Sequence, residues 1–214
     1  MIFKKDLLLL QQAIKIYNRR VGKQYLVAYR TNKNHRSKVI ELSICEENFW
    51  HLIGCKVNSD CDGHIVYQSC LEGKDVTESL SYTRRSQDLK KKAEVFCKLF
   101  DFIANAKVLR IASTENAPEA AMFCVGAGTV AGLIGYDKVS KFHIPKTTQD
   151  KSIFALDKNA SDKIFLVLSK SDGSDIYDVI EYSISKEHAG ELCSELMDAY
   201  NISEILCDNK CEQQ

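Results

Sequence analysis

The chain has 214 residues, 45% of them hydrophobic, which suffices for one well-filled core and is short for two. Its 29 Lys and Arg residues balance 29 Asp and Glu residues, and this excludes a uniformly basic protein of the histone or ribosomal kind. No apolar stretch approaches the roughly 20 residues of a membrane span, so we expect no integral membrane protein.

The balanced charge is unevenly distributed along the chain. Residues 1–40 contain ten Lys and Arg residues and one acid, whereas residues 171–214 contain eleven acids and two lysines. A basic amino-terminal face suits a phosphate backbone or an acidic partner, and an acidic tail suits a basic partner or the repulsion of off-target nucleic acid. Two simply solvated faces would give the same pattern.

The nine cysteines are an odd number, and a chain of this size does not need disulfides to fold. The apolar run at residues 7–10 follows two lysines but is only four residues long, short of the roughly 7–15 of a secretory signal. We therefore expect reduced thiols and a cytoplasmic location.

The first predicted elements are a helix and a hairpin. Residues 5–20 place Leu7, Leu10, Ile14 and Tyr17 at helical spacing, which predicts an amphipathic helix. Residues 25–30 and 38–44 are rich in aromatic and β-branched side chains, and a basic polar loop separates them. This pattern predicts a β-hairpin with a long tip.

The remainder of the chain alternates between helical and strand-like patterns. Helices are predicted over residues 86–105 and 187–200, with strong strands at residues 163–169 and 177–184. Short strand-like segments interrupted by glycine fill residues 108–112, 121–125, 129–136 and 141–144. The order predicts a single α+β domain, residues 1–214, in which two or three helices pack on a mainly antiparallel sheet.

Three motifs were weighed for ligand binding. The glycine segment 126–132 resembles a dinucleotide loop, but strand-like sequence follows it, and we expect a glycine-relaxed hairpin or bulge. Cys61 with His64 and Cys207 with Cys211 have no second pair at zinc-finger distance; incidental thiols are expected, with structural zinc as the alternative. We expect no metal and no cofactor, and the usual hydrolase and NTPase signatures are missing.

Histidines near hydroxyls and bases are the remaining candidates for chemistry. His51 lies between large apolar residues, where a core histidine satisfied by backbone is one interpretation and a functional imidazole the other. His143 precedes Thr147 and Thr148, and Ser169 with Lys170 ends a predicted strand. Spacing alone does not show that these groups converge.

Three segments resemble a known nuclease family. Residues 48–54 (NFWHLIG) look like its Asn-Phe-x-His-Leu-x-Gly core, residues 67–74 with 90–106 look like its two-helix middle, and residues 143–153 with the strand 163–170 are similar to its closing segments. The family is the fourth phage-associated group of barnase, EndoU, colicin and RelE-like nucleases. The resemblance covers about residues 40–185; Lys146 departs from the family's usual Asn, and the helical amino-terminal and acidic carboxyl-terminal extensions fall outside it.

The resemblance implies the fold of this nuclease type and metal-independent cleavage of RNA by a phage or mobile-element toxin or effector. It implies His51 as general acid or base, Lys170 or Arg84 as the cation for the phosphate, and Thr147 or Thr148 with Ser169 as orienting hydroxyls. The basic amino-terminal face would bind RNA through Arg19, Arg20, Arg30 and Arg36.

An alternative hypothesis is that the chain has the nuclease fold but no nuclease activity. An inactive nuclease scaffold could engage a host protein, an antitoxin or another protein partner through its charged ends, since a fold does not dictate a function. Exposure of purified protein to RNA in EDTA distinguishes the two. A small-molecule enzyme built on the glycine segment has little support.

Overall fold

The computed structural model describes residues 2–30, 37–113, 123–158, 160–171, 173–185 and 189–208. Its helices and strands, in chain order, are α1 (Lys4–Asn18), β1 (Lys23–Arg30), β2 (Lys38–Ser43), α2 (Asn48–Ile53), β3 (Cys55–Val57), α3 (Gly63–Leu71), β4 (Leu80–Tyr82), α4 (Ser86–Leu99), β5 (Arg110–Ser113), β6 (Val125–Thr129), β7 (Gly132–Val139), β8 (Phe142–Gln149), the 3-10 turn η1 (Ile153–Ala155), β9 (Asp162–Ser171), β10 (Val179–Ser183), α5 (Ala189–Met197) and α6 (Glu204–Asp208).

One large sheet organises the molecule, with strand order β1-β2-β8-β7-β6-β5-β9-β10. Strand β1 pairs with β2 on one side and with β9 on the other, so the pairings close seven strands into a ring, and β10 extends from β9. Every pairing of this sheet is antiparallel except the one between β2 and β8, which meet at Leu42 and His143. The predicted α+β class with a mainly antiparallel sheet is confirmed.

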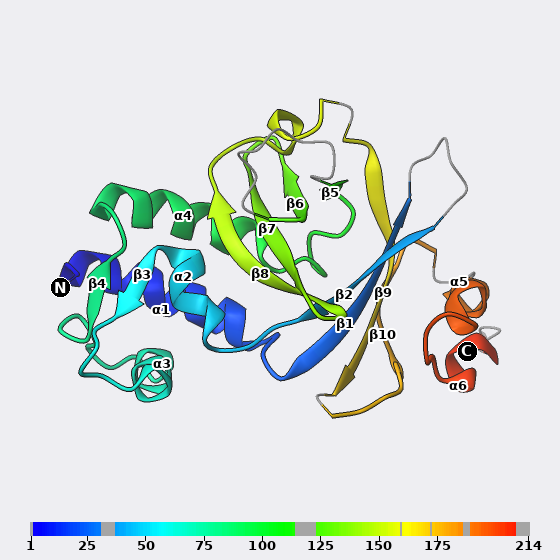
Figure 1. Ribbon diagram of the computed structural model, residues 1–214, viewed down its shortest axis with the longest axis horizontal. Helices are drawn as coiled ribbons and strands as arrows, with labels where there is room; N and C mark the ends of the chain where they lie inside the picture. Colours follow the sequence, from blue (N-terminus) through cyan, green and yellow to red (C-terminus); the bar gives the residue numbers. More distant parts are fainter. Residues whose placement is uncertain are drawn as a thin grey trace.

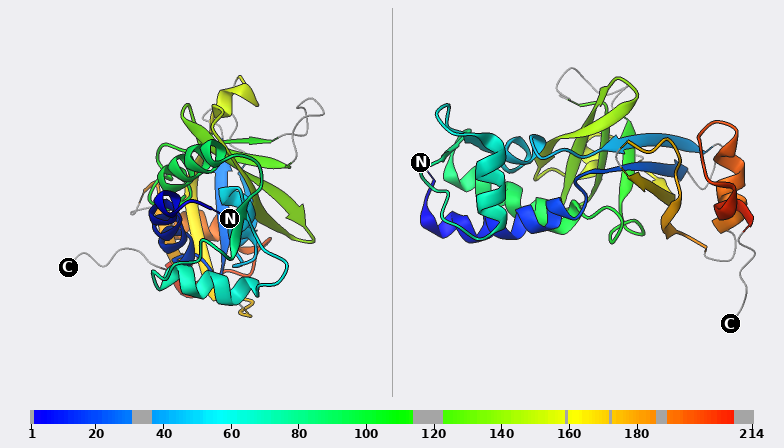
Figure 2. Two further views of the ribbon diagram at one scale, coloured as in Figure 1. Left: turned by 90° about the vertical axis from the view of Figure 1, so that its left-hand side faces the viewer. Right: turned by 90° about the horizontal axis from the view of Figure 1, so that it is seen from below.

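Strand β1 is buried on both faces, and each face belongs to a different core. Tyr25, Val27 and Tyr29 join the main core, whereas Leu26 and Ala28 join a second core with α5 and α6. This alternation is the period-two arrangement of a strand. Figures 1 and 2 show α1 to α4 at one end of an elongated molecule and α5 with α6 at the other.

Aromatic packing fixes the position of α2, the short helix that carries His51. The Phe49 ring of α2 lies 5.3 Å from Tyr17 of α1 and 6.1 Å from Phe96 of α4, measured between centroids. Phe96 in turn stacks on Phe100 at 4.5 Å. Such pairs contribute roughly 0.5–1.5 kcal/mol each beyond area burial. The rigid cluster therefore holds α2 against the amino-terminal helices.

Helix α4 is shorter than predicted, and the glycine segment has the predicted hairpin structure. Helix α4 ends at Leu99 and not near residue 105, because Asp101 accepts a hydrogen bond from the Ala104 N–H and starts a new turn. The glycine segment forms the β6–β7 hairpin, as expected. A Cβ at Gly132 would lie 2.5 Å from Val95 Cγ1, so glycine lets α4 approach this hairpin.

Within the part of the chain that the structure describes, no helix combines the length and the apolar character needed to cross a bilayer.

Candidate functional site

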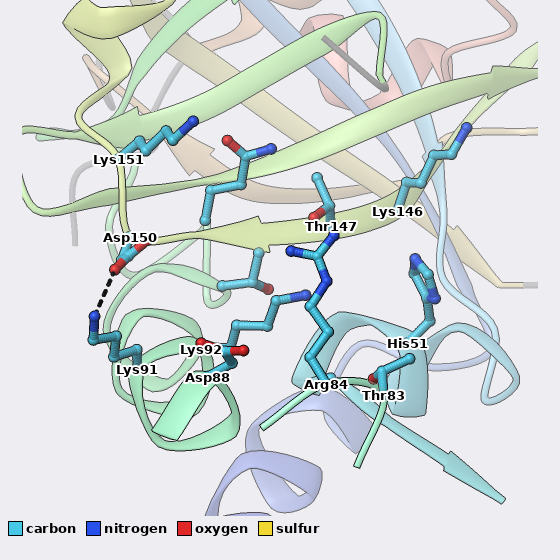
Figure 3. Close-up of a pocket in the computed structure, with 13 residues that line it drawn as sticks. His51, Thr83, Arg84, Asp88, Lys91, Lys92, Lys146, Thr147, Asp150 and Lys151 are labelled. Atoms are coloured by element: carbon cyan, nitrogen blue, oxygen red, sulfur yellow. Dashed lines mark ion pairs between the residues drawn. The ribbon is translucent and has the colours of Figure 1, made fainter. Parts of the chain in front are cut away.

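A pocket of about 540 Å³ opens between α2, the segment joining β4 to α4, and the carboxyl-terminal half of β8. Its lining is dominated by cations: Arg84, Lys91, Lys92, Lys146 and Lys151. Two carboxylates, Asp88 and Asp150, also line it. Figure 3 shows Arg84 and Lys92 reaching toward the strand that carries Thr147, whereas Lys146 and Lys151 extend away from them. The cavity thus carries an excess of positive charge.

Ion pairs neutralise only part of that charge. Lys91 Nζ lies 3.7 Å from Asp150 Oδ2, and Lys146 is paired with Asp137. Arg84, Lys92 and Lys151 have no salt-bridge partner among the residues that the structure describes. The pocket therefore offers three cations without an ion pair to an anionic ligand.

Lys92 is partly buried, and its stem depends on a glycine. Burial lowers the pKa of the Lys92 ammonium, the positive charge of Arg84 lowers it further, and Asp88 opposes both. Gly54 ends α2 in the left-handed region at φ +84°, and a Cβ there would lie 3.2 Å from Lys92 Cδ. A glycine at position 54 therefore allows the left-handed turn and also leaves space for the Lys92 side chain.

His51 faces out of the core and into this pocket. Helix α2 buries Phe49, Trp50, Leu52 and Ile53, and the helical period leaves His51 exposed. The interpretation as a core histidine satisfied by backbone is therefore wrong. Partial burial lowers the pKa of the imidazole below its usual 6.5, and the nearby charges of two pocket lysines lower it further. The ring is neutral at pH 7 and available as a base.

Strand β8 supplies hydroxyls from the opposite wall. The register of β7 against β8 shifts between Gly135 and Tyr136, which leaves Lys146 as the extra residue, and residues 146–149 of β8 line the pocket. Thr147 is half-buried, whereas Thr148 is 1% exposed and its Oγ1 has no hydrogen-bond partner among the described residues. A buried hydroxyl that lines a pocket without a partner is a ready donor to a ligand.

The structure does not bring Ser169 and Lys170 to this pocket. Ser169 Oγ donates a 2.7 Å hydrogen bond to Glu181, and Lys170 Nζ lies 4.6 Å from the centroid of the Tyr177 ring. Both residues are buried on β9, which is separated from β8 by β1 and β2. Of the two cations that the sequence offered for a phosphate, only Arg84 lies beside His51.

The predicted RNA-binding arginines are also placed away from the pocket. Arg19 is exposed near the end of α1, Arg20 Nη2 lies 2.6 Å from Asp101 Oδ1, and Arg30 packs 4.7 Å above the Phe165 ring. None of the three lines the pocket. Arg36 lies outside the described residues.

Lys92 was not among the candidate site residues predicted from the sequence. A signal was present: Lys92 follows Leu89 by three positions and precedes Phe96 by four, at the border of the buried stripe. A lysine at such a border extends its stem along apolar surface and delivers its ammonium to the edge of the core. Thr83 was missed without any comparable signal.

Of the possible zinc ligands, Cys211 lies outside the described residues, so the pair of Cys207 with Cys211 stays a prediction. His64 Nδ1 lies 2.7 Å from Glu46 Oε2, and Cys61 is half-buried nearby. Among the residues described, no three or more His, Cys, Asp and Glu side chains are grouped so that they could hold a metal ion.

The model of the phage-Barnase-EndoU-ColicinE5/D-RelE like nuclease4 family matches residues 9–186. The chain belongs to this nuclease family. The match includes every element that lines the pocket, and it begins within α1, well before the residue 40 at which the sequence analysis placed the family-like region. Comparisons with curated proteins and with solved structures found no significant match.

Proposed function

We propose that this member of the nuclease family is an endoribonuclease of a phage or mobile element, and that it cleaves RNA with its own side chains and no metal. One observation carries the proposal: a neutral, exposed imidazole, His51, shares a pocket with the unpaired cations Arg84 and Lys92. A base beside an anion-binding site is what transfer of a phosphoryl group to a hydroxyl requires.

The reaction is an internal transesterification. His51 takes the proton of the ribose 2′-OH, and the oxygen attacks the adjacent phosphorus. The bond from phosphorus to the 5′-oxygen of the next nucleotide breaks, and that oxygen must receive a proton. The products are a 2′,3′-cyclic phosphate and a free 5′-hydroxyl, so neither water nor an oxidant enters the balance.

Lys92, which lines the pocket together with His51, is the proton donor that we assign to the leaving oxygen. Its pKa is lowered by burial and by Arg84, which makes the ammonium a stronger acid than a solvated lysine. Arg84 cannot fill this role, because a guanidinium does not lose its proton in proteins. Arg84 instead supplies a fixed positive charge for the phosphorane, with Thr147 and Thr148 donating hydrogen bonds to the phosphate oxygens.

The proposed substrate explains why the activity would be selective for RNA. Only a ribonucleotide carries the attacking hydroxyl, so DNA bound in the same pocket has no nucleophile. A toxin or effector of this kind would act in the cytoplasm, and a protein antitoxin that covers the pocket would be its natural partner.

The direct test is incubation of the purified protein with total RNA in excess EDTA, beside the His51→Ala variant. We expect degradation by the wild type and not by the variant. Intact RNA in both reactions, with the wild type folded and able to bind a protein from its genomic neighbourhood, would favour the inactive binding module.

A further inference from the structure

A second pocket of about 490 Å³ adjoins the cationic one, and the two share His51 and Thr83. Its charge is different. The carboxylates Glu46 and Glu47 line it with a single lysine, Lys56, beside Trp50 and His64. The proposed base therefore lies between a pocket in which cations outnumber carboxylates and one in which carboxylates outnumber lysines.

Trp50 gives the second pocket a rigid aromatic wall. The side chain is 6% exposed, and its ring packs 5.0 Å from Phe49 and 6.4 Å from Tyr67, both at steep angles. Because these contacts hold the indole in place, the part that lines the pocket is fixed before any ligand arrives. A flat aromatic ligand could therefore contact the Trp50 indole without the entropic cost of ordering that side chain.

The two carboxylates determine which hydrogen-bonding groups a bound ligand should carry. Glu46 is held by His64 Nδ1 at 2.7 Å and by Gln68 Nε2 at 3.0 Å. Glu47 is exposed and makes no side-chain hydrogen bond with the described residues. Ionised carboxylates only accept hydrogen bonds, so they favour a ligand with N–H donors and disfavour one that offers only carbonyl oxygens.

We propose that this second pocket binds the nucleobase next to the scissile phosphate and prefers a base with an exocyclic amino group. This inference rests on the proposed function, because it places the phosphate in the cationic pocket and the base beyond His51. Adenine, cytosine and guanine carry such an amino donor, whereas uracil presents carbonyl oxygens on both sides of its single N–H. The expected order is the three amino-bearing bases ahead of uracil.

Trp50 is the only tryptophan of the chain, so its fluorescence reports directly on this pocket. The experiment titrates the protein with each nucleoside 3′-monophosphate and with inorganic phosphate, and corrects for absorption with a free tryptophan derivative. We expect 3′-AMP, 3′-CMP and 3′-GMP to quench Trp50 with a Kd about tenfold below that of 3′-UMP, the size of a single charge-assisted hydrogen bond. Inorganic phosphate should bind without quenching.

The Glu47→Gln variant tests the carboxylate, and Glu191→Gln, at an exposed position of α5, is its matched control. Glu47→Gln should reduce the tenfold preference to about threefold or less, because an amide can donate as well as accept. Glu191→Gln should leave it unchanged. Equal affinity for all four nucleotides, or quenching by inorganic phosphate alone, would overturn the inference.

Failure of this inference and failure of the proposed function give different results. If RNA stays intact while the nucleotides bind with the expected preference, the proposed nuclease activity is wrong and the nucleotide-binding pocket is supported. Oligoribonucleotides that are cut equally at every base, without quenching of Trp50, would leave the nuclease and remove the base pocket.

Discussion

Replacement of His51 by alanine separates catalysis from folding unusually well. The imidazole is exposed on the last turn of α2 and makes no side-chain hydrogen bond within the described structure. Substitutions at such surface positions typically change stability by less than about 0.5 kcal/mol. The variant should therefore fold, melt close to the wild type, and keep the cationic pocket intact.

The expected loss is kinetic. A positioned general base contributes about 10²- to 10⁴-fold, so kcat/KM of His51→Ala should fall by that factor, equivalent to about 2.7–5.4 kcal/mol of transition-state stabilisation. Single-turnover cleavage of a labelled oligoribonucleotide in EDTA measures it. Added imidazole should restore part of the rate, because the exposed pocket admits it.

The pH dependence of kcat/KM shows whether His51 acts as a base or as an acid. His51 acts as base in its neutral form, and its pKa lies below 6.5. The wild-type kcat/KM should thus be level near pH 7 and fall as the pH drops through the lowered pKa. A His51→Ala variant within tenfold of the wild type, or one with the same acidic limb, would refute the assignment.

Three further substitutions test the surrounding residues. Lys92→Arg keeps the charge and removes the proton donor, so we expect a loss of about 10²-fold in kcat/KM. Lys90→Arg, on the exposed face of the same helix, should cause no change. Equal rates for the two variants would exclude Lys92 as the acid. Arg84→Ala should lower kcat/KM about 10²-fold or more, whereas the neighbouring exposed Arg85→Ala, which removes the same charge outside the pocket, should cost only a few-fold; equal losses would mean that only the overall field matters. Lys170→Met should reduce thermal stability by about 0.5–2 kcal/mol through the lost contact with an aromatic ring, and should leave kcat/KM unchanged; a selective loss of rate with no loss of stability would return Lys170 to the site.

The sequence predicted the fold class because periodic patterns report which face of an element is buried. The helical spacing of residues 5–20 became α1 with Leu10, Ile14 and Tyr17 buried, and that of residues 86–105 became α4 over Ser86–Leu99. The ring closure by β1 and β9 could not be foreseen, since it depends on pairing between strands more than 130 residues apart. Likewise, α3 was visible only through the family resemblance.

The site was predicted in part, and the division has a physical cause. His51, Arg84, Thr147 and Thr148, to which the resemblance gives catalytic roles, line one pocket, and those roles stay predictions. Ser169 and Lys170 form a strand end that looks equally functional in one dimension, but β9 turns them toward Glu181 and Tyr177. Whether a polar residue on a strand faces a pocket or a packed neighbour is decided by tertiary pairing, which no local pattern encodes.

We propose that the pocket cuts RNA through the ribose hydroxyl without a metal. A single experiment compares an oligoribonucleotide with a copy carrying one 2′-deoxy substitution at the cleaved position, both in excess EDTA, with analysis of the product ends. We predict a 2′,3′-cyclic phosphate from the first and no cleavage at that position in the second. Equal cleavage of both, or cleavage that appears only when a divalent metal is restored, would show that the proposed reaction is wrong.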